Sequence, residues 1–209
     1  MRQLPVAWRW ALAGLIAVVA LAAALWPRGR DAETPVETTA ADTAVSGQQR
    51  AAAGLAACPQ PAAGGTGAGP LAGLAVNCLA DGGSLDLSAA LAGKPALLNL
   101  WAYWCAPCAK ELPYLQQFAQ RAGNAITVLT VHSDPEEAKA ISRLMGLDVR
   151  LPGVLDAAAR VRTAVGAPAV LPISVLVRAD GSVAKVVVRA FSGVDDIAGT
   201  VAQELGVAA

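Results

Sequence analysis

A buried-strand pattern that runs directly into a pair of cysteines constrains the fold of this chain most strongly. Residues 96–102 read Ala-Leu-Leu-Asn-Leu-Trp-Ala, a nearly continuous apolar run that is typical of a strand buried on both faces. Cys105 and Cys108 follow, and from Cys105 to about Gly123 the sequence takes a helical period. Two cysteines at this spacing lie on one face of a helix, close enough to bond. The sequence therefore predicts a cysteine pair where a buried strand gives way to a helix.

Strands and helices alternate along the chain after Leu74. The patterns predict strands at 74–78, 84–87, 96–102, 126–131, 149–155, 173–178 and 182–189, and helices at 105–123, 134–146, 157–164 and 192–205. Asp134 is expected to cap the second of these helices, with Pro135 at its first position. Strands that alternate with helices, followed by a terminal hairpin, indicate an α/β fold.

The position of the cysteine pair indicates redox chemistry. Cys105 is expected at the N-terminus of the helix, where unpaired backbone amides and the helix dipole favour a thiolate. We expect Cys105 to attack a substrate disulfide and Cys108, further inside the helix, to resolve the mixed disulfide. A structural disulfide or two inert core thiols is the alternative, but a Cys-x-x-Cys that follows a buried strand and opens a helix favours the redox interpretation.

The segment from Asn99 to Pro113, which reads NLWAYWCAPCAKELP, resembles the active site of the TlpA/ResA/CcmG group of thioredoxin-like proteins. The resemblance covers about residues 70–207 and is most specific in this segment and at 171–181. Members of the group are membrane-anchored extracytoplasmic thiol–disulfide oxidoreductases, several of which reduce apocytochrome c. The resemblance implies a thioredoxin-like domain over 71–209, with a central mixed sheet flanked by helices.

The resemblance also draws attention to Asn99 and Glu111. Asn99 replaces the buried acid of ordinary thioredoxins, and Glu111 occupies the glutamate position of the group's Cys-x-x-Glu-Leu-Pro continuation. Glu111 shares a helix face with Cys108, and a carboxylate near two thiols disfavours thiolates and can relay protons. The residues alone leave this role open, and the resemblance implies a catalytic role for Glu111. A solvated glutamate near the helix start is the alternative.

Leu171 and Pro172 match the group's cis-proline position, directly before a predicted strand. A cis-proline there would leave the backbone of Leu171 free to pair with an extended substrate peptide. Trp104 is expected to line the same peptide groove. The group often has Thr after this proline, whereas Ile173 stands here, and this departure affects the expected substrate preference.

The first thirty residues predict a membrane anchor. The stretch from Trp10 to Trp26 contains no charged side chain, is flanked by arginines on both sides and has tryptophans at its ends. A retained anchor is favoured over a signal peptide cleaved near Ala24, because cleavage there would leave a short apolar core. A retained anchor predicts a single-pass protein of the cytoplasmic membrane with an extracytoplasmic catalytic domain.

Residues 31–70 are expected to form a flexible linker, because the segment is rich in small and polar residues and has no apolar period. Cys58 lies in this segment and Cys78 follows it. We expect the two to form a structural disulfide, which implies an oxidising compartment; two unpaired thiols are the alternative.

Composition excludes several other classes of protein. The chain of 209 residues has a formal net charge of zero and no strongly basic block, so it offers no footprint for nucleic acid. His132 is the only histidine, which excludes multi-histidine metal sites and disfavours a Ser-His-Asp hydrolase; we expect it to be structural. No cofactor and no metal are expected.

Two classes of function remain open. The first is a thiol–disulfide oxidoreductase, either a reductant of apocytochrome c in c-type cytochrome maturation or an oxidase of secreted proteins. The resemblance favours the reductant, which requires a membrane electron donor of the CcdA/DsbD type. The second class is a non-enzymatic copper-binding module that uses the same two thiols.

Overall fold

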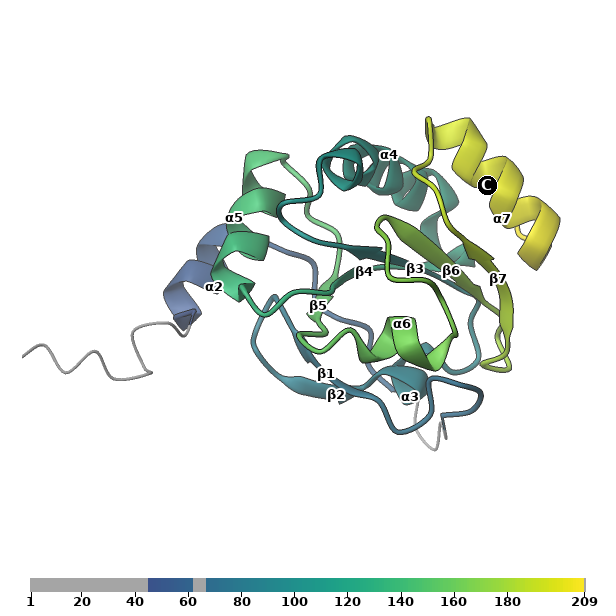
Figure 1. Cartoon of the computed structure of the whole chain (residues 1–209), viewed down its shortest axis with the longest axis horizontal. Helices are drawn as coiled ribbons and strands as arrows, with labels where there is room; N and C mark the ends of the chain where they lie inside the picture. The colour runs from purple at the N-terminus through teal and green to yellow at the C-terminus, as the bar shows by residue number, and fades with distance from the viewer. Residues whose placement is uncertain (1–44, 62–66, 209) are drawn as a thin grey trace, which may run out of the picture. The chain divides into compact units, whose positions relative to one another are not determined.

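The computed structural model describes residues 45–61 and 67–208. The elements in chain order are α2 (Gly47–Ala53), β1 (Ala75–Cys78), β2 (Ser84–Asp86), α3 (Leu87–Leu91), β3 (Ala96–Trp101), α4 (Ala106–Ala122), the 3-10 helix η2 (Gly123–Ala125), β4 (Thr127–His132), α5 (Glu137–Gly146), β5 (Gly153–Leu155), α6 (Arg160–Ala164), β6 (Ile173–Val177), β7 (Val183–Val187) and α7 (Val194–Leu205). Figure 1 shows how these helices surround the sheet.

The strands in the described ranges form one mixed sheet in the order β2-β1-β5-β4-β3-β6-β7. Strand β3 lies between parallel β4 and antiparallel β6, and each of its residues is buried, as the apolar run predicts. In this register Leu100 of β3 pairs with Ile173, the first residue of β6. The C-terminal end of β3 and the N-terminal end of β6 therefore lie side by side. Cys105 follows the end of β3, and Pro172 directly precedes β6, so the two residues lie at the same end of the sheet.

The two faces of the sheet carry separate hydrophobic clusters. Side chains of α4, α5 and α7 pack with Leu97 and Trp101 of β3 on one face. Leu98 and Leu100 of the same strand point to the opposite face, where they join α3, α6 and the Cys58–Cys78 pair. This alternation places Asn99, between Leu98 and Leu100, on the α4 face of the sheet.

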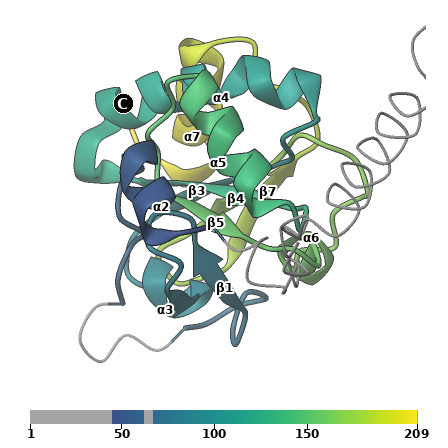
Figure 2. The ribbon, with the colours of Figure 1, turned by 90° about the vertical axis from the view of Figure 1, so that its left-hand side faces the viewer.

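The flexible linker expected over residues 31–70 is wrong for residues 47–53. Residues 47–53 form helix α2, which begins with a capping box between Ser46 and Gln49 and buries Ala53 against the core. The guanidinium of Arg50 forms a two-pronged ion pair with Glu137 of α5, at 2.9 and 3.0 Å. Figures 1 and 2 show α2 against α5. The sequence did not predict this helix because it has no apolar period. The capping box and the ion pair with Glu137 stabilise it instead.

Four other elements differ from the sequence expectation. Strand β5 is confined to Gly153–Leu155, α6 begins only at Arg160, and the short helix α3 follows β2 without an apolar pattern to announce it. Helix α5 has Glu136 rather than Asp134 as its N-cap. The carboxylate of Asp134 instead accepts hydrogen bonds from the Glu136 amide and from the indole of Trp104. The tertiary contact with Trp104 thus takes the place of the expected helix cap.

The predicted membrane anchor, residues 1–30, lies outside the described residues. Within 45–61 and 67–208, no helix combines the length and hydrophobicity that a bilayer span requires.

Candidate functional site

The cysteine pair forms a disulfide at the N-terminus of α4. Cys105 and Cys108 are bonded, with their Cα atoms 5.3 Å apart. Cys105 is the N-cap residue of the helix, and its Sγ accepts a hydrogen bond from the Cys108 amide at 3.3 Å. The helix then continues through Pro113 to Ala122. When the disulfide opens, the same amide and the helix dipole are in place to stabilise a thiolate on Cys105.

The peptide bond between Leu171 and Pro172 is cis. Leu171 packs on the hydrophobic cluster that contains Cys105 and Cys108, so the cis-proline turn and the disulfide lie at the same sheet edge. Among the backbone bonds of the described residues, none involves the amide or carbonyl of Leu171. The backbone of Leu171 is therefore available to an extended peptide beside the disulfide.

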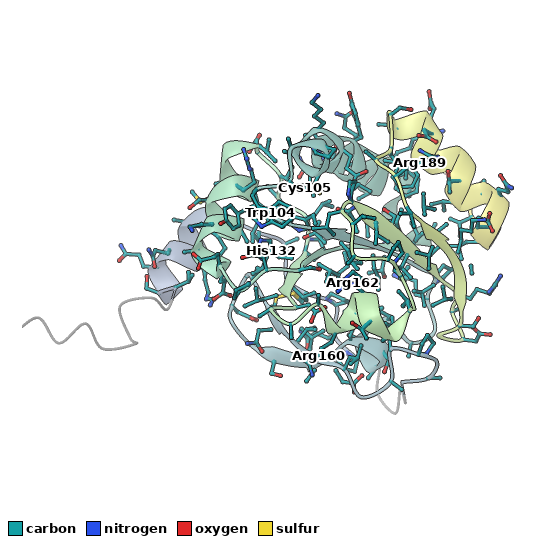
Figure 3. The ribbon with its side chains drawn as sticks, in the orientation of Figure 1. Trp104, Cys105, His132, Arg160, Arg162 and Arg189 are labelled. Atoms are coloured by element: carbon teal, nitrogen blue, oxygen red, sulfur yellow. A yellow bond between two sulfur atoms is a disulfide. The ribbon has the colours of Figure 1, made fainter. Side chains whose placement is uncertain are left out.

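A groove of about 350 Å³ is lined by Trp104, the residue directly before Cys105 in the chain. The lining comes from the loops after β3 and β4, from the start of α6 and from the turn before β6: Trp104, Ser133, Ala159, Arg162, Ala169, Val170 and Leu171. Trp104 and Val170 are 58% and 51% exposed, which is high for side chains of their size. Figure 3 shows Trp104 beside Cys105, with Arg162 extending from α6. The groove combines an apolar lining with one charged side chain.

Two side chains hold the loop that carries Trp104. The indole Nε1 of Trp104 donates a hydrogen bond to Asp134 Oδ2 at 3.0 Å. The Tyr103 amide donates to His132 Nε2 at 3.2 Å. Burial lowers the pKa of His132 to about 4, so the imidazole is neutral near pH 7 and its Nε2 can accept this bond. His132 therefore has a positioning role, in keeping with the structural role expected from the sequence.

Glu111 is fully buried on the inner face of α4, one turn after Cys108. Its Oε1 accepts a hydrogen bond from Asn99 Nδ2 at 2.7 Å, and its Oε2 accepts one from the Phe191 amide at 2.8 Å. Asn99 Nδ2 also lies 3.2 Å from the hydroxyl of Ser174 on β6. The alternative of a solvated glutamate is therefore wrong, because the carboxylate is enclosed and held by two donors.

The pKa of Glu111 is raised to about 6, chiefly because burial disfavours its charged form. The Phe191 and Asn99 hydrogen bonds and the positive charge of Arg189 act in the opposite direction and limit the rise. A carboxyl group with a pKa near 6 is mostly ionised at pH 7 and can still exchange a proton readily. Glu111 is thus a buried carboxyl group that can change its protonation state near neutral pH.

The second disulfide joins Cys58 to Cys78, the pairing expected from the sequence. Its sulfurs lie in the hydrophobic cluster on the other face of the sheet, with Leu98 and Val154. The bond connects the segment after α2 to strand β1, and the two cysteines are 20 residues apart in the sequence. It is therefore placed to fix the N-terminal arm to the sheet.

The fold thus brings the predicted site residues together in two groups. Cys105 caps α4, which contains Cys108 and Glu111, while Trp104 and Leu171, the residue before Pro172, line the groove. Sequence reasoning missed Asp134, Ser174 and Arg162. The acid at Asp134 was interpreted as a helix cap, and neither Ser174 nor Arg162 stands in a motif, so their roles depend on tertiary contacts.

Comparison with proteins of known sequence finds relatives among thiol–disulfide oxidoreductases. The chain is 32% identical over 98 residues to thiol–disulfide oxidoreductase ResA of Bacillus subtilis, covering 46% of this chain and 54% of that protein. It is 28% identical over 101 residues to ResA of Bacillus cereus, covering 47% and 57%. The chain thus spans somewhat more than half the length of these curated relatives.

Solved structures show the same fold. A secreted Mycobacterium tuberculosis disulfide oxidoreductase homologous to E. coli DsbE is similar with a TM-score of 0.54 and 29% identity, over 62% of this chain and 95% of that one. The exposed lipoprotein thioredoxin Etrx1 of Streptococcus pneumoniae has the same TM-score and 28% identity, over 62% and 98%. These likenesses confirm the thioredoxin-like α/β fold and the family group that the sequence resembles. A model of the Redoxin family matches residues 62–202, and the chain therefore belongs to the Redoxin family.

Proposed function

We propose that this protein is an extracytoplasmic thiol–disulfide oxidoreductase that reduces the cysteines of apocytochrome c during c-type cytochrome maturation. The observation that carries the proposal is the Cys105–Cys108 disulfide at the N-terminus of α4, beside a cis-proline turn with an unpaired backbone. The ResA relatives, which are named thiol–disulfide oxidoreductases, support the same chemistry.

The reaction is a two-electron exchange of disulfides. The Cys105 thiolate attacks one sulfur of the substrate disulfide, a mixed disulfide forms, and the other substrate sulfur leaves as a thiolate. Cys108 then loses its proton and attacks the Cys105 sulfur. The second substrate thiolate is released, and the Cys105–Cys108 disulfide is left behind. The two electrons have passed to the substrate, so a donor must reduce the pair before the next cycle.

Glu111 supports the resolving step and the direction of electron flow. Its buried carboxylate lies on the same helix face as Cys108 and can accept the proton that Cys108 must lose. While ionised, the carboxylate disfavours a second negative charge on the neighbouring thiols. Ionisation of a thiol to a thiolate stabilises the reduced form of the pair. Where ionisation is disfavoured, the reduced form is less stable relative to the disulfide, and the pair is a better reductant.

The groove beside the disulfide supports a peptide substrate. An extended peptide could pair with the backbone of Leu171 and lay a side chain against Trp104. Apocytochrome c presents its cysteines in a short Cys-x-x-Cys-His segment, and a segment of this kind can enter an open groove. A membrane electron donor of the CcdA/DsbD type would supply the electrons.

The location on the outer side of the cytoplasmic membrane is part of the proposal. The apolar stretch between Trp10 and Trp26 supports a single-pass anchor. The Cys58–Cys78 disulfide supports an oxidising compartment, since structural disulfides persist outside the cytoplasm. An anchor would hold the catalytic domain at the membrane, where haem is attached to apocytochrome c.

The redox state of the pair in growing cells tests the proposal. Thiols are alkylated in intact cells, and the modified protein is resolved by mass spectrometry. We expect Cys105 and Cys108 to be reduced, Cys58 and Cys78 to be bonded, and c-type cytochromes to be lost when the gene is deleted. A stable Cys105–Cys108 disulfide with normal cytochromes after deletion would instead indicate an oxidase of secreted proteins. Stoichiometric copper on the purified protein, without reduction of insulin, would indicate a copper-binding module.

A further inference from the structure

The groove beside the disulfide contains a positive charge that the exchange reaction itself does not use. Arg162 is the only charged residue among the described residues that line the groove. Its guanidinium makes no side-chain hydrogen bond or ion pair with any residue in 45–61 or 67–208, whereas that of Arg160, two residues earlier, bonds to the carbonyl of Ala75. Figure 3 shows both arginines on α6, and of the two only Arg162 lines the groove together with Trp104.

A second polar group in the groove is also unpaired. The hydroxyl of Ser133 is buried and has no hydrogen-bond partner among the described residues. Buried polar atoms in folded proteins usually have partners, whereas this hydroxyl has none although Ser133 itself lines the groove. The backbone of Leu171 adds a third set of unpaired donors and acceptors at the same place.

The acidic groups near the groove are already engaged. Asp134 accepts bonds from Trp104 and from the Glu136 amide. Asp156 is buried, and its carboxylate accepts bonds from the amides of Arg160 and Val161 at the start of α6. These carboxylates are occupied by other donors, so the charge of Arg162 remains available to a ligand.

We propose that Arg162 selects substrates that carry an acidic side chain close to their reactive cysteine. The inference rests on the proposed exchange function and deepens it by naming a substrate class. A peptide paired with Leu171 runs along the groove, its apolar side chains contact Trp104 and Val170, and a carboxylate on a residue near the cysteine forms an ion pair with Arg162. Charge complementarity argues for this occupant, because a basic peptide would meet an uncompensated guanidinium.

A series of peptides that differ in one side chain tests the inference. Each peptide carries a single cysteine in a mixed disulfide with thionitrobenzoate. One position beside the cysteine is varied at a time, and it holds Glu, Gln or Lys. The same three substitutions are then made at the next position along the peptide. The protein is the full chain with Cys108→Ser, so that Cys105 attacks the peptide sulfur, thionitrobenzoate leaves, and the peptide stays bonded to Cys105. Release of thionitrobenzoate gives the rate, and the mass of the adduct identifies the product.

At the preferred position, the Glu peptide should react about fivefold faster than the Gln peptide, the size of a favourable partly exposed ion pair. The Lys peptide should be the slowest. Arg162→Gln should bring the ratio of the Glu and Gln rates to about one, and Arg162→Glu should reverse the preference. Because the ratio compares two peptides on one protein, a partly unfolded variant does not change it.

Lys94→Gln is the matched control. Lys94 is exposed and lies before β3, at the opposite end of the strand from Cys105, and the substitution removes the same charge. It should retain the preference of the parent protein. Equal rates for all three peptides, or an unchanged ratio in Arg162→Gln, would overturn the role of Arg162 while leaving the exchange function intact. Failure of Cys105 to react with any peptide would overturn the exchange function and the inference together.

Discussion

The two disulfides of this protein are buried to almost the same degree, yet their surroundings differ. Cys58 and Cys78 are 4% and 2% exposed, and Cys105 and Cys108 are 4% and 0% exposed. Cys78 ends a strand within the sheet, whereas Cys105 caps a helix beside a groove. Burial therefore does not distinguish the two bonds. The backbone amides at the start of α4, which can stabilise a departing or attacking thiolate, do distinguish them.

The comparison extends to what each bond connects. The Cys58–Cys78 bond joins residues separated by 20 positions and ties the arm that includes α2 to the sheet. The Cys105–Cys108 bond spans a separation of 3 within one helical turn. A longer closed loop restricts the unfolded chain more, so the first bond is suited to stability and the second can open with little loss of structure.

The largest expected effect separates the two cysteines of the helix. Cys105→Ser should abolish thiol–disulfide exchange, because it removes the sulfur at the helix terminus. Cys108→Ser should still attack substrates but should accumulate mixed disulfides, because the resolving thiol is absent. Mass spectrometry of adducts under non-reducing conditions measures both results. Accumulation of adducts on the Cys105→Ser protein instead would reverse the assigned roles.

The next effect sharpens the contrast in stability. Replacing both Cys58 and Cys78 with Ser should lower the free energy of unfolding by about 3 kcal/mol, and the same change at Cys105 and Cys108 by about 2 kcal/mol, from their loop lengths. Urea denaturation of the oxidised proteins measures the difference. The first variant should retain the exchange activity of the parent protein. Loss of exchange in a variant that remains folded would show that the Cys58–Cys78 bond takes part in turnover.

A third effect concerns Glu111, the buried carboxylate one turn after Cys108. Glu111→Gln removes a buried negative charge near the thiols and should raise the reduction potential of the Cys105–Cys108 pair by about 30 mV, equivalent to a tenfold change in the exchange equilibrium. The carboxyl is ionised above a pKa of about 6 and protonated below it. The difference between the two proteins should therefore be full at pH 8 and should disappear as the pH falls below 6.

Glu204→Gln on α7 is the charge-matched control for that experiment, because Glu204 pairs with Lys185 near the helix end, away from the cysteines. Its potential should follow that of the parent protein at every pH. A difference between Glu111→Gln and the parent that does not vary with pH would contradict the proposed electrostatic coupling.

The smallest expected effect concerns the loop beside the reactive bond. Asp134→Ala removes the acceptor of the Trp104 indole and should slow exchange with peptides about threefold, the equivalent of one modest hydrogen bond. Asp134→Asn keeps an acceptor oxygen and should recover part of the rate. The reduction potential should be the same in both variants, since Trp104 lines the groove and is proposed to act on the substrate rather than on the thiols. A shift in potential would assign Asp134 a different role.

Local patterns predicted much of this structure. A strong periodic or turn signal predicted strand β3, helix α4 and the β6–β7 hairpin. The Cys-x-x-Cys motif indicated thiol–disulfide chemistry. Helix α2 was missed because its stability comes from Ser46, Gln49 and the ion pair of Arg50 with Glu137 rather than from an apolar face. Tertiary partners of this kind leave no trace in local periodicity.

The site was predictable to a similar extent. The sequence spacing placed Glu111 on the same helix face as Cys108, but its full burial depends on Asn99 and on the Phe191 amide, which lies 80 residues away. Arg162 and Ser133 come from separate segments that the fold brings to one groove. No local pattern could connect them, because their relation exists only in three dimensions.

The central claim is that the Cys105–Cys108 pair works as a reductant, and its reduction potential tests this most directly. The full chain is equilibrated with glutathione buffers at pH 7, and the fraction of reduced pair is measured by alkylation and mass spectrometry. The account predicts a potential near or below about −270 mV, the range of reducing thioredoxins. A potential near about −120 mV, typical of a strong oxidant of secreted proteins, would contradict it.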